Sequence, residues 1–285
     1  MTDAPGGGPV RVATFNVRAA IGPGPFPDRW WRHADPHRLE RIANVVRSLD
    51  ADLVGLQEVA LIATAGLVVD QSADLGRETG SVWRYGATRT FPIDDDGELV
   101  GAGLFGNAIL SRHPIRSART VGLPMAPMDA FVEPAGSEHP AAGLRYADAP
   151  STIREPRCIL VCEVELPSGV ATVASTHLSH VGAGERRLQA EAVALALRDV
   201  PLPIILLGDF NAPIDRPELA PLRDRMVDAF AASDTPPGDP ARRSTDDGHP
   251  IDHVFLQGIG ATSCRVVRES GEASDHFPVL ATLSR

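Results

Sequence analysis

Hydrophobic residues recur along the chain in short runs whose spacing predicts buried β-strands. Residues 10–17, VRVATFNV, alternate between apolar and polar side chains, which predicts a strand. Residues 52–59, DLVGLQEV, are more continuously apolar. The run PIILLGD, residues 203–209, has apolar side chains at consecutive positions, which indicates a strand buried on both faces. Each of these runs ends in or near a polar side chain.

Helical spacing separates several of the strands. In residues 35–50, leucine, isoleucine and valine recur every three or four positions, with Asp35 as N-cap and Pro36 as the first helical residue. A second helix is predicted within residues 69–80 and should end at Gly80. Residues 184–200 predict an amphipathic helix, and residues 218–230 a weaker one.

The remaining hydrophobic runs predict further strands, and two of them, separated by PSG, predict a hairpin. The order of elements mixes hairpins with strand–helix crossovers. We therefore expect an α+β fold with two mainly antiparallel sheets and helices on the outside. The further strands are residues 82–90, 103–112, 114–122, 153–166, 169–179, 249–258, 262–270 and 275–285.

Some stretches have no clear periodicity. Residues 1–8, MTDAPGGG, are typical of a flexible tail, which leaves residues 9–285 as a single expected domain. Residues 19–34, 122–152 and 232–249 are rich in Pro, Gly, Asp or Arg and predict long loops. A long loop in a compact domain is often functional, and 19–34 carries two tryptophans and two arginines that could equally belong to the core.

Composition narrows the classes of function. The formal net charge is −10 and lysine is absent, so non-specific binding to nucleic acid is disfavoured, although a local basic patch could exist. Residues 1–8 lack signal-peptide features and no apolar run is long enough to span a membrane, so we expect a cytoplasmic protein. Cys158 and Cys162 lie about 13 Å apart if both are in one strand, too far for a disulfide. Together with Cys264 they are interpreted as buried apolar residues.

Polar residues able to bind metal or move protons interrupt the ends of the apolar runs. Any one of them could simply satisfy a backbone group or cap a turn. Asp209 and Asn211 are two residues apart, so they should project into one space unless the turn redirects Asn211. A shared site at the strand ends explains the whole set better than separate structural roles. The set is Asn16, Glu58, His177, Asp209, Asn211, Asp252, Asp275 and His276.

In order along the chain, the motifs TFNV, LQEV, GNAILSR, STHLS, GDFN, IDHVF and SDHFPV resemble those of the endonuclease/exonuclease/phosphatase superfamily. The resemblance covers residues 14–279. It implies a four-layer α/β/β/α sandwich with the site at one rim. It also implies that the site binds a divalent ion, Mg²⁺ or Mn²⁺, and that water hydrolyses a phosphate ester there. Arg18 stands where some nuclease members have an acid, and His177 where abasic-site enzymes have a tyrosine. Both departures favour the deoxyribonuclease- and sphingomyelinase-like branches.

The resemblance also implies roles for individual residues. Glu58 is the expected metal ligand, with Asn16 ligating or orienting it and Asp275 completing the shell directly or through water. Asp209 would orient or deprotonate the attacking water, although in some relatives the base is His276. The family pattern pairs His276 with Asp252.

The other expected roles concern the phosphate. Asn211, His177 and His276 would donate hydrogen bonds to it, and the sequence indicates no partner for His177. Asn107 and Arg157 match positions near the pocket, where a substrate contact and a structural role are equally open. The role of His253 is also open.

These observations favour a metal-dependent hydrolase that acts on a small or lipid-derived phosphate ester, with a diester favoured over a monoester. The protein is expected to be a monomer. A DNA or RNA nuclease of the same superfamily is the alternative, which a continuous Arg-lined groove beside Asp209 would favour. A non-catalytic binding module is the third reading, but such a module should have lost metal or acid–base positions. The sequence retains all of them.

Overall fold

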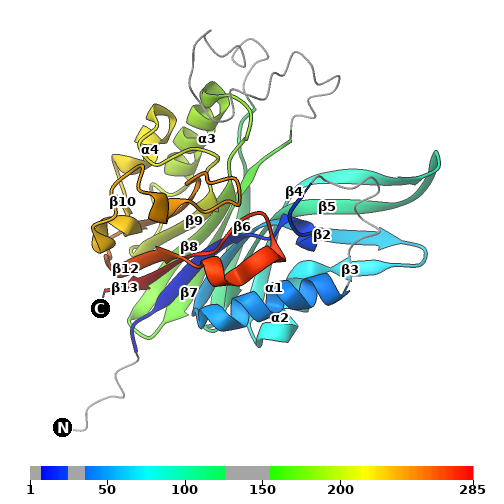
Figure 1. Cartoon of the computed structure of the whole chain (residues 1–285), viewed down its shortest axis with the longest axis horizontal. Helices are drawn as coiled ribbons and strands as arrows, with labels where there is room; N and C mark the ends of the chain where they lie inside the picture. The colour runs from blue at the N-terminus through cyan, green and yellow to red at the C-terminus, as the bar shows by residue number, and fades with distance from the viewer. Residues whose placement is uncertain (1–7, 25–35, 126–154, 285) are drawn as a thin grey trace.

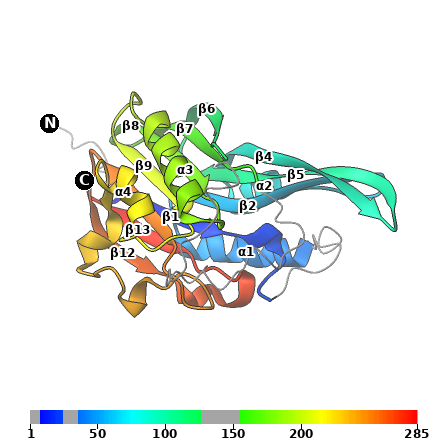
Figure 2. The ribbon, with the colours of Figure 1, turned by 90° about the horizontal axis from the view of Figure 1, so that it is seen from above.

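In the computed structural model of the chain, the described residues are 8–24, 36–125 and 155–284. Two β-sheets pack face to face, and helices cover their outer faces (Figure 1). The view from above shows α1 and α3 on opposite sides of the paired sheets (Figure 2). This arrangement confirms the predicted α/β/β/α sandwich.

The first sheet contains seven strands, in the order β12-β13-β1-β2-β5-β4, with β3 paired to β2. The second contains six, in the order β10-β11-β9-β8-β7-β6. The strands are β1 Arg11–Asn16, β2 Leu53–Thr64, β3 Val68–Asp70, β4 Val82–Asp95, β5 Glu98–Ser111, β6 Ile115–Gly122, β7 Cys158–Leu166, β8 Gly169–His177, β9 Ile204–Asp209, β10 Val227–Asp228, β11 Asp252–Gln257, β12 Ala261–Val266 and β13 Val279–Leu283. The helices are α1 Pro36–Leu49, α2 Gln71–Thr79, α3 Ala183–Ala196 and α4 Ala220–Arg223, with short 3-10 helices between them.

Most strand pairs are antiparallel, as predicted, but each sheet contains one parallel pair. β1 pairs with β2 and β8 pairs with β9 in parallel. Parallel neighbours need a crossover connection, and α1 and α3 provide it. Because of these pairs, the carboxyl ends of β1 and of β8 and β9 lie at the same rim of the sandwich.

The alternation of side chains along each strand builds two kinds of core. On β9, Ile205 and Leu207 point toward the other sheet, whereas Ile204 and Leu206 pack under α3. This confirms that the run 203–209 is buried on both faces. The same alternation on β1 places Val12 between the sheets and the neighbouring positions under α1.

The helix caps agree with the sequence where they are described. Asp70 caps α2 through a hydrogen bond from Ala73 N, and Gly80 ends it with a left-handed φ of 65°. The predicted N-cap of α1, Asp35, lies outside the described residues. No helix in the described part of the chain is long and apolar enough to cross a membrane.

Several predicted boundaries differ from the structure. The predicted helix over 218–230 is wrong beyond Arg223, because residues from Val227 pair with β11 as a short edge strand. The strand predicted at 262–270 ends at Val266 and is followed by a 3-10 helix. β4 and β5 are longer than predicted, and their hairpin projects beyond the sandwich in Figure 1. β4 includes Pro92, which an edge strand tolerates.

The loops that lacked periodicity are only partly described. Residues 25–34, with both tryptophans of the first loop, and 126–152 of the second lie outside the described residues. Residues 232–249 form ordered turns that pack beside the rim. Cys158, Cys162 and Cys264 are free and buried, which confirms their interpretation as apolar core residues.

Candidate active site

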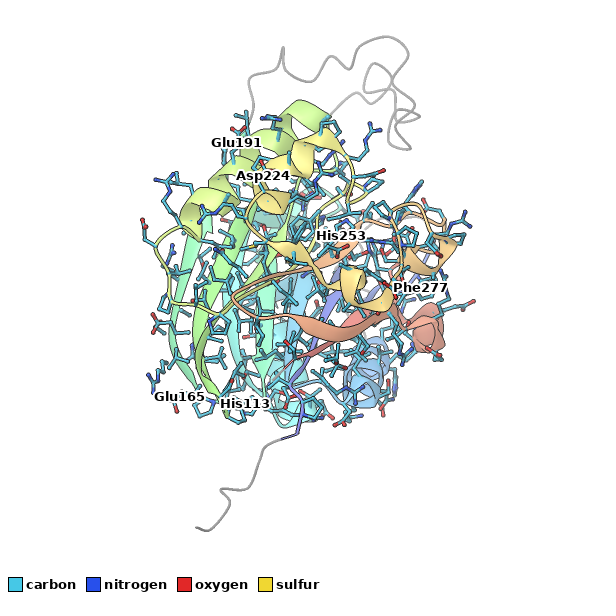
Figure 3. All side chains as sticks on the ribbon, turned by 90° about the vertical axis from the view of Figure 1, so that its left-hand side faces the viewer. His113, Glu165, Glu191, Asp224, His253 and Phe277 are labelled. Atoms are coloured by element: carbon cyan, nitrogen blue, oxygen red, sulfur yellow. The ribbon has the colours of Figure 1, made fainter. Side chains whose placement is uncertain are left out.

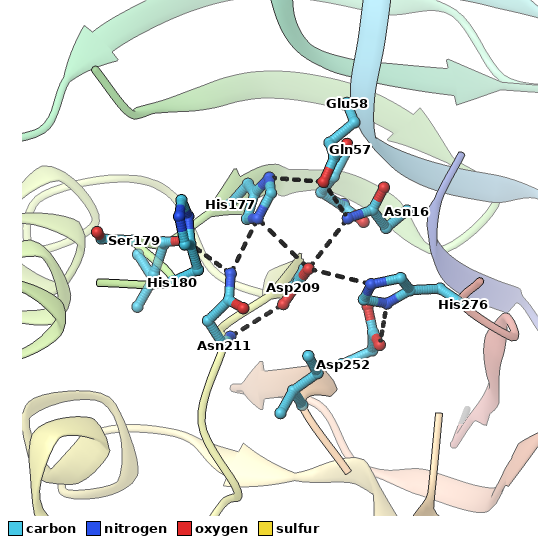
Figure 4. A network of polar contacts seen from close by, with 12 residues as sticks. Asn16, Gln57, Glu58, His177, Ser179, His180, Asp209, Asn211, Asp252 and His276 are labelled. Carbon is cyan, nitrogen blue, oxygen red and sulfur yellow. Dashed lines mark hydrogen bonds and ion pairs between the residues drawn. The ribbon is translucent and has the colours of Figure 1, made fainter. Parts of the chain in front are cut away.

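The polar residues at the strand ends meet at one rim of the sandwich, between the two sheets (Figure 4). The alternation explains how they get there. On β9, Asp209 has the same parity as Leu207, which faces the first sheet. On β1, Asn16 continues the face of Val12 and Thr14. On β8, His177 follows the inward-facing Val173 at the same spacing.

Glu58 reaches this rim through an irregularity in β2. By simple alternation it would share the face of Leu56, which packs under α1. The pairing of β2 with β5 shifts register between Leu56 and Val59, and Glu58 has a φ of 55°. Such a bulge re-aims a side chain. It brings the Glu58 carboxylate within 2.9 Å of Asn16 Nδ2.

Asp209 lies at the centre of the polar network. Its Oδ2 is 3.0 Å from Asn16 Nδ2, 3.4 Å from His177 Nε2 and 3.7 Å from His276 Nε2. Its Oδ1 accepts a hydrogen bond from Asn211 N at 2.9 Å. The Asp209 carboxylate is thus 1% exposed and within reach of groups from both sheets.

Burial dominates the electrostatics of Asp209. Desolvation, followed by the nearby negative charge of Asp252, raises the pKa of Asp209 to about 7. His276 and the hydrogen bonds from Asn16 and Asn211 act in the opposite direction. A carboxyl group with a pKa near neutrality is suited to accept a proton in catalysis.

Asp252 and His276 form the pair that the family pattern implies. Asp252 Oδ2 lies 2.8 Å from His276 Nδ1 and also accepts from Ser244 Oγ at 2.7 Å. Burial alone lowers the pKa of His276, but the charges of Asp252 and then Asp209 outweigh it and raise this pKa well above its ordinary value. His276 is therefore an imidazolium at neutral pH, with Nε2–H directed toward Asp209.

His177 has a partner that the sequence did not identify. Arg157 Nη1 lies 3.0 Å from His177 Nδ1. A guanidinium has only donors, so Nδ1 accepts and a neutral ring carries its proton on Nε2, toward Asp209. Burial, then Arg157, holds the pKa of His177 well below its ordinary value. The amide of Asn211, 3.0 Å from Nε2, donates instead to Leu178 O at 3.0 Å.

The two residues expected near the substrate are both buried and bound to protein atoms. Asn107 is 1% exposed and donates to Cys158 O at 3.0 Å. Arg157 is 5% exposed, and besides His177 it contacts Glu155 at 3.1 Å. These contacts favour the structural alternative for Asn107 and a positioning role for Arg157.

Glu58 and Asp275, which form the metal side of the site, carry the oxygen ligands that a hard cation prefers. Desolvation raises the pKa of Glu58, although the hydrogen bond from Asn16 and the charges of Arg157 and His276 act in the opposite direction. In the part of the chain that the structure describes, Glu58 has one ion-pair contact, to His177 at 4.0 Å, and that ring is neutral. A partly buried carboxylate that contacts no guanidinium among the described residues suits an oxygen-binding divalent ion. Asn16 directs its amide nitrogen at Glu58 and its carbonyl at Arg18 N, so it orients Glu58.

A second group of potential ligands consists of Asp209, Asp252 and His276, whose ligand atoms lie within 4.8 Å of one another. The hydrogen bond between Asp252 and His276 already occupies Nδ1. A charged imidazole cannot ligate a metal, so this group is better described as an acid–base cluster. Glu58 is better suited than this group to hold a metal ion.

The structure adds site residues that sequence reasoning missed. In the sequence Arg18 stands out only as a departure from the acid that some nuclease members have at this position. In the structure its Nε lies 3.0 Å from Asp275 Oδ2. His180, whose Nδ1 is 3.2 Å from Arg157 Nη2, follows His177 closely in STHLSH, and that repetition was an available signal. Ser244 belongs to a loop without periodicity, and nothing local connects it to Asp252.

Comparisons with known proteins bear on the family and the fold. The family model described as "Endonuclease/Exonuclease/phosphatase family" matches residues 13–276. No curated protein sequence matches the chain. Among solved structures, an endonuclease/exonuclease/phosphatase from Beutenbergia cavernae is 24% identical with a TM-score of 0.70, covering 96% of this chain and 71% of that one.

Of two further solved structures, one is named for a phosphatase activity and the other for a bound DNA product. The mannosyl-6-phosphatase of Bacteroides thetaiotaomicron is 21% identical with a TM-score of 0.60, covering 97% of this chain and 100% of that one. TDP2 of D. rerio, complexed with a single-strand DNA product, is 14% identical with a TM-score of 0.62, covering 97% of this chain and 99% of that one. At these identities the matches show a shared fold.

Proposed function

The chain belongs to the endonuclease/exonuclease/phosphatase family, a superfamily of hydrolytic phosphoesterases, and on that premise we propose that it uses a divalent metal ion and an activated water. We propose that residues 9–285 form one catalytic domain and that the substrate is a small or lipid-derived phosphodiester. The observation that carries the proposal is the contact of Asp209 with His177 and His276 at the shared rim.

Asp209 is the proposed base. Its pKa of about 7 lets the carboxylate form hold a water by hydrogen bonding and take its proton. The hydrogen bond from Asn211 N fixes one oxygen, and Asn16 fixes the other. The carboxylate is therefore oriented before substrate binds, which lowers the cost of reaching the reactive geometry.

The proposed donors to the phosphate are His276, His177 and Asn211. Phosphodiester hydrolysis builds negative charge on the phosphate oxygens, so fixed donors and positive charge stabilise the transition state. His276 contributes an imidazolium held by Asp252, and His177 contributes a neutral N–H held by Arg157. Each ring nitrogen facing the pocket is thus a donor.

Glu58 would hold the divalent ion, with Asp275 as a further ligand directly or through water. A bound Mg²⁺ or Mn²⁺ supplies positive charge that neutralises the phosphate. The partly buried Glu58 carboxylate and its raised pKa support this assignment, because a cation would relieve the cost of its charge.

The choice of substrate rests on charge. A net charge of −10 without lysine disfavours an extended phosphate backbone, whereas a small ester needs only the local donors. The similar folds include a described mannosyl-6-phosphatase and a protein crystallised with a DNA product, so the test must include monoester, diester and nucleic acid.

The test is a panel of bis-p-nitrophenyl phosphate, p-nitrophenyl phosphate, sphingomyelin, plasmid DNA and an abasic oligonucleotide. We expect hydrolysis of a diester with Mg²⁺ or Mn²⁺ and none with EDTA. Glu58→Gln should lower turnover about a hundredfold or more, because a neutral amide binds a hard cation weakly.

Glu191→Gln provides a control, because Glu191 lies exposed on α3 in an ion pair with Arg187. It removes the same charge and should leave turnover unchanged. Full activity in the metal-stripped protein would contradict the metal dependence. Preferred cleavage of plasmid DNA would make the nuclease the correct function.

A further inference from the structure

Arg18 places a fixed positive charge on the metal side of the site. Its Nε lies 3.0 Å from Asp275 Oδ2, and both side chains are largely buried, with 13% and 28% exposed. Arg18 Nη1 donates to Gly22 O at 2.7 Å, which ties the other side of the guanidinium to the backbone. An ion pair held in this way has little freedom to separate.

The backbone that carries Arg18 is unusual. Arg18, Ala19 and Ala20 have φ values of 46°, 48° and 58°, so three consecutive non-glycine residues are left-handed. Each such residue is strained, because a left-handed backbone brings Cβ too close to the carbonyl oxygen that follows. Tertiary contacts hold the segment, since Gln71 Nε2 donates to Ala19 O at 2.7 Å and Arg18 N donates to Asn16 Oδ1 at 3.0 Å. The chain therefore uses a strained conformation to aim this guanidinium.

The ion pair makes the two carboxylates of the metal side unequal. Asp275 Oδ2 faces Arg18, and its Oδ1 accepts from Ser274 Oγ at 3.2 Å. Glu58 instead accepts from the neutral amide of Asn16. An incoming divalent ion therefore meets one carboxylate that contacts no guanidinium among the described residues and one that is already in an ion pair with Arg18.

We propose that Arg18 is a positioning residue that competes with the divalent ion for Asp275 and weakens the binding of that ion. The inference rests on the proposed metal dependence, and it adds that the Arg18–Asp275 ion pair sets the affinity of the site for the divalent ion. The site then holds its ion mainly through Glu58, so that the ion exchanges readily with the free pool. A second consequence is that Asp275 contacts a divalent ion fully only when it is released from Arg18.

The test is a titration of the metal-free protein with Mn²⁺ alone, followed by the electron paramagnetic resonance signal of free Mn²⁺. We expect Arg18→Gln to lower the dissociation constant about tenfold, because the Asp275 carboxylate is released from its ion pair and becomes available to the ion. Arg18→Lys keeps the charge and should remain near the wild type. A damaged site would bind Mn²⁺ more weakly, so tighter binding cannot arise from misfolding.

Arg116→Gln is the matched control for net charge. Arg116 pairs with Glu165 on the strand next to β8, at the end of the sandwich away from the site. Figure 3 shows Glu165 at one end of the molecule and His253, which follows Asp252, well away from it. Removing this arginine should leave the Mn²⁺ dissociation constant unchanged.

A second comparison tests whether the effect passes through Asp275. In an Asp275→Asn background, the gain from Arg18→Gln should largely disappear, because no carboxylate is left to be released. A gain of the same size in that background would overturn the competition, since it would reflect charge repulsion at a distance.

The outcomes separate this inference from the proposed function. If the wild type binds Mn²⁺ and Glu58→Gln abolishes that binding, the metal site is established. If Arg18→Gln then binds Mn²⁺ no more tightly than the wild type, the proposed role of Arg18 is overturned while the metal site stands. Absence of Mn²⁺ binding by the wild type overturns the proposed metal dependence instead. Circular dichroism of each variant establishes that the compared proteins are folded.

Discussion

At the scale of single residues, the site depends on which groups carry charge. Asp252 is 1% exposed, and a buried carboxylate needs compensation. His276 provides it through a 2.8 Å hydrogen bond, and Ser244 donates to the same oxygen. The pair is an internal ion pair whose outer end, His276 Nε2, faces Asp209. We therefore treat Asp252 and His276 as one functional unit.

Asp252→Asn should lower turnover on the order of a hundredfold with little change in fold. The amide keeps the shape but removes the charge that raises the pKa of His276. Protonated His276 is the proposed active form, so activity is lost as pH rises through its pKa. A lower pKa moves that loss to lower pH, which a pH–turnover profile measures.

The double variant Asp252→Asn/His276→Ala should be scarcely less active than His276→Ala, because the two residues act as a unit. Turnover of both single variants and of the double variant gives the comparison. Losses that multiply as independent effects would show that Asp252 has a different role.

At the scale of elements, a short turn after β9 carries Asp209 and Asn211. Asn211 has a left-handed φ of 50°, and Phe210 N donates to Ile251 O at 2.9 Å. His253 on the neighbouring β11 contacts Ala212 O through Nε2 at 2.8 Å. The turn is therefore held by the strand that follows it in the sheet, and His253, whose role the sequence left open, is one of its supports.

His253 should make the protein less stable in mild acid. It is 1% exposed and its Nε2–H donates to a carbonyl, and burial lowers its pKa below the ordinary value. Below about pH 6.5 His253 gains a proton in the unfolded chain but not in the folded chain. The free energy of unfolding therefore decreases as the pH is lowered, by at most about 1.4 kcal/mol per pH unit. His253→Gln still donates but cannot be protonated, so urea denaturation at pH 7 and pH 5 should show a smaller loss of stability than in the wild type.

The matched control for this prediction is His37→Gln. His37 is an exposed side chain near the start of α1, and its replacement should leave the difference in stability between pH 7 and pH 5 as in the wild type. An equal acid sensitivity of wild type and His253→Gln would rule out His253 as a source.

At the scale of the whole molecule, the site exists only where the two sheets meet. Asn16 and Glu58 come from the first sheet, and His177 and Asp209 from the second. The separation of the sheets therefore sets the distances in the site. Close to the rim, Gly55 on β2 faces Leu207 on β9, and a Cβ at Gly55 would lie 2.7 Å from Leu207 Cβ.

Gly55→Val should push the sheets apart, although valine itself favours strands. We expect a loss of about 1–3 kcal/mol in the free energy of unfolding, as for an overpacked core. Turnover should fall as well, because Glu58 and Asp209 lie just beyond the clash on their strands. Urea denaturation and an activity assay measure both.

Gly66→Val is the control, since a Cβ at Gly66 would have no neighbour within 4 Å. It should change neither quantity. Wild-type stability in Gly55→Val would show that the sheets adapt to the added side chain.

The sequence by itself determined the layers and the composition of the site. The alternating run at 10–17 predicts the strand β1, and the continuous run at 204–207 specifies a strand covered on both sides. These are local properties, because side-chain direction along a strand has a period of two. Polar residues that end such runs, as Asp209 and His177 do, could therefore be assigned to one rim from their positions in the sequence.

The tertiary structure decided how those residues are aimed and neutralised. Glu58 enters the site through a bulge that simple alternation does not predict. Arg157 became the partner of His177, and Arg18 the partner of Asp275, through contacts between segments distant in sequence. Hydrogen bonds and ion pairs depend on distances of a few ångströms. Those distances are set by the packing of the two sheets and by strained backbone that only the complete fold can hold.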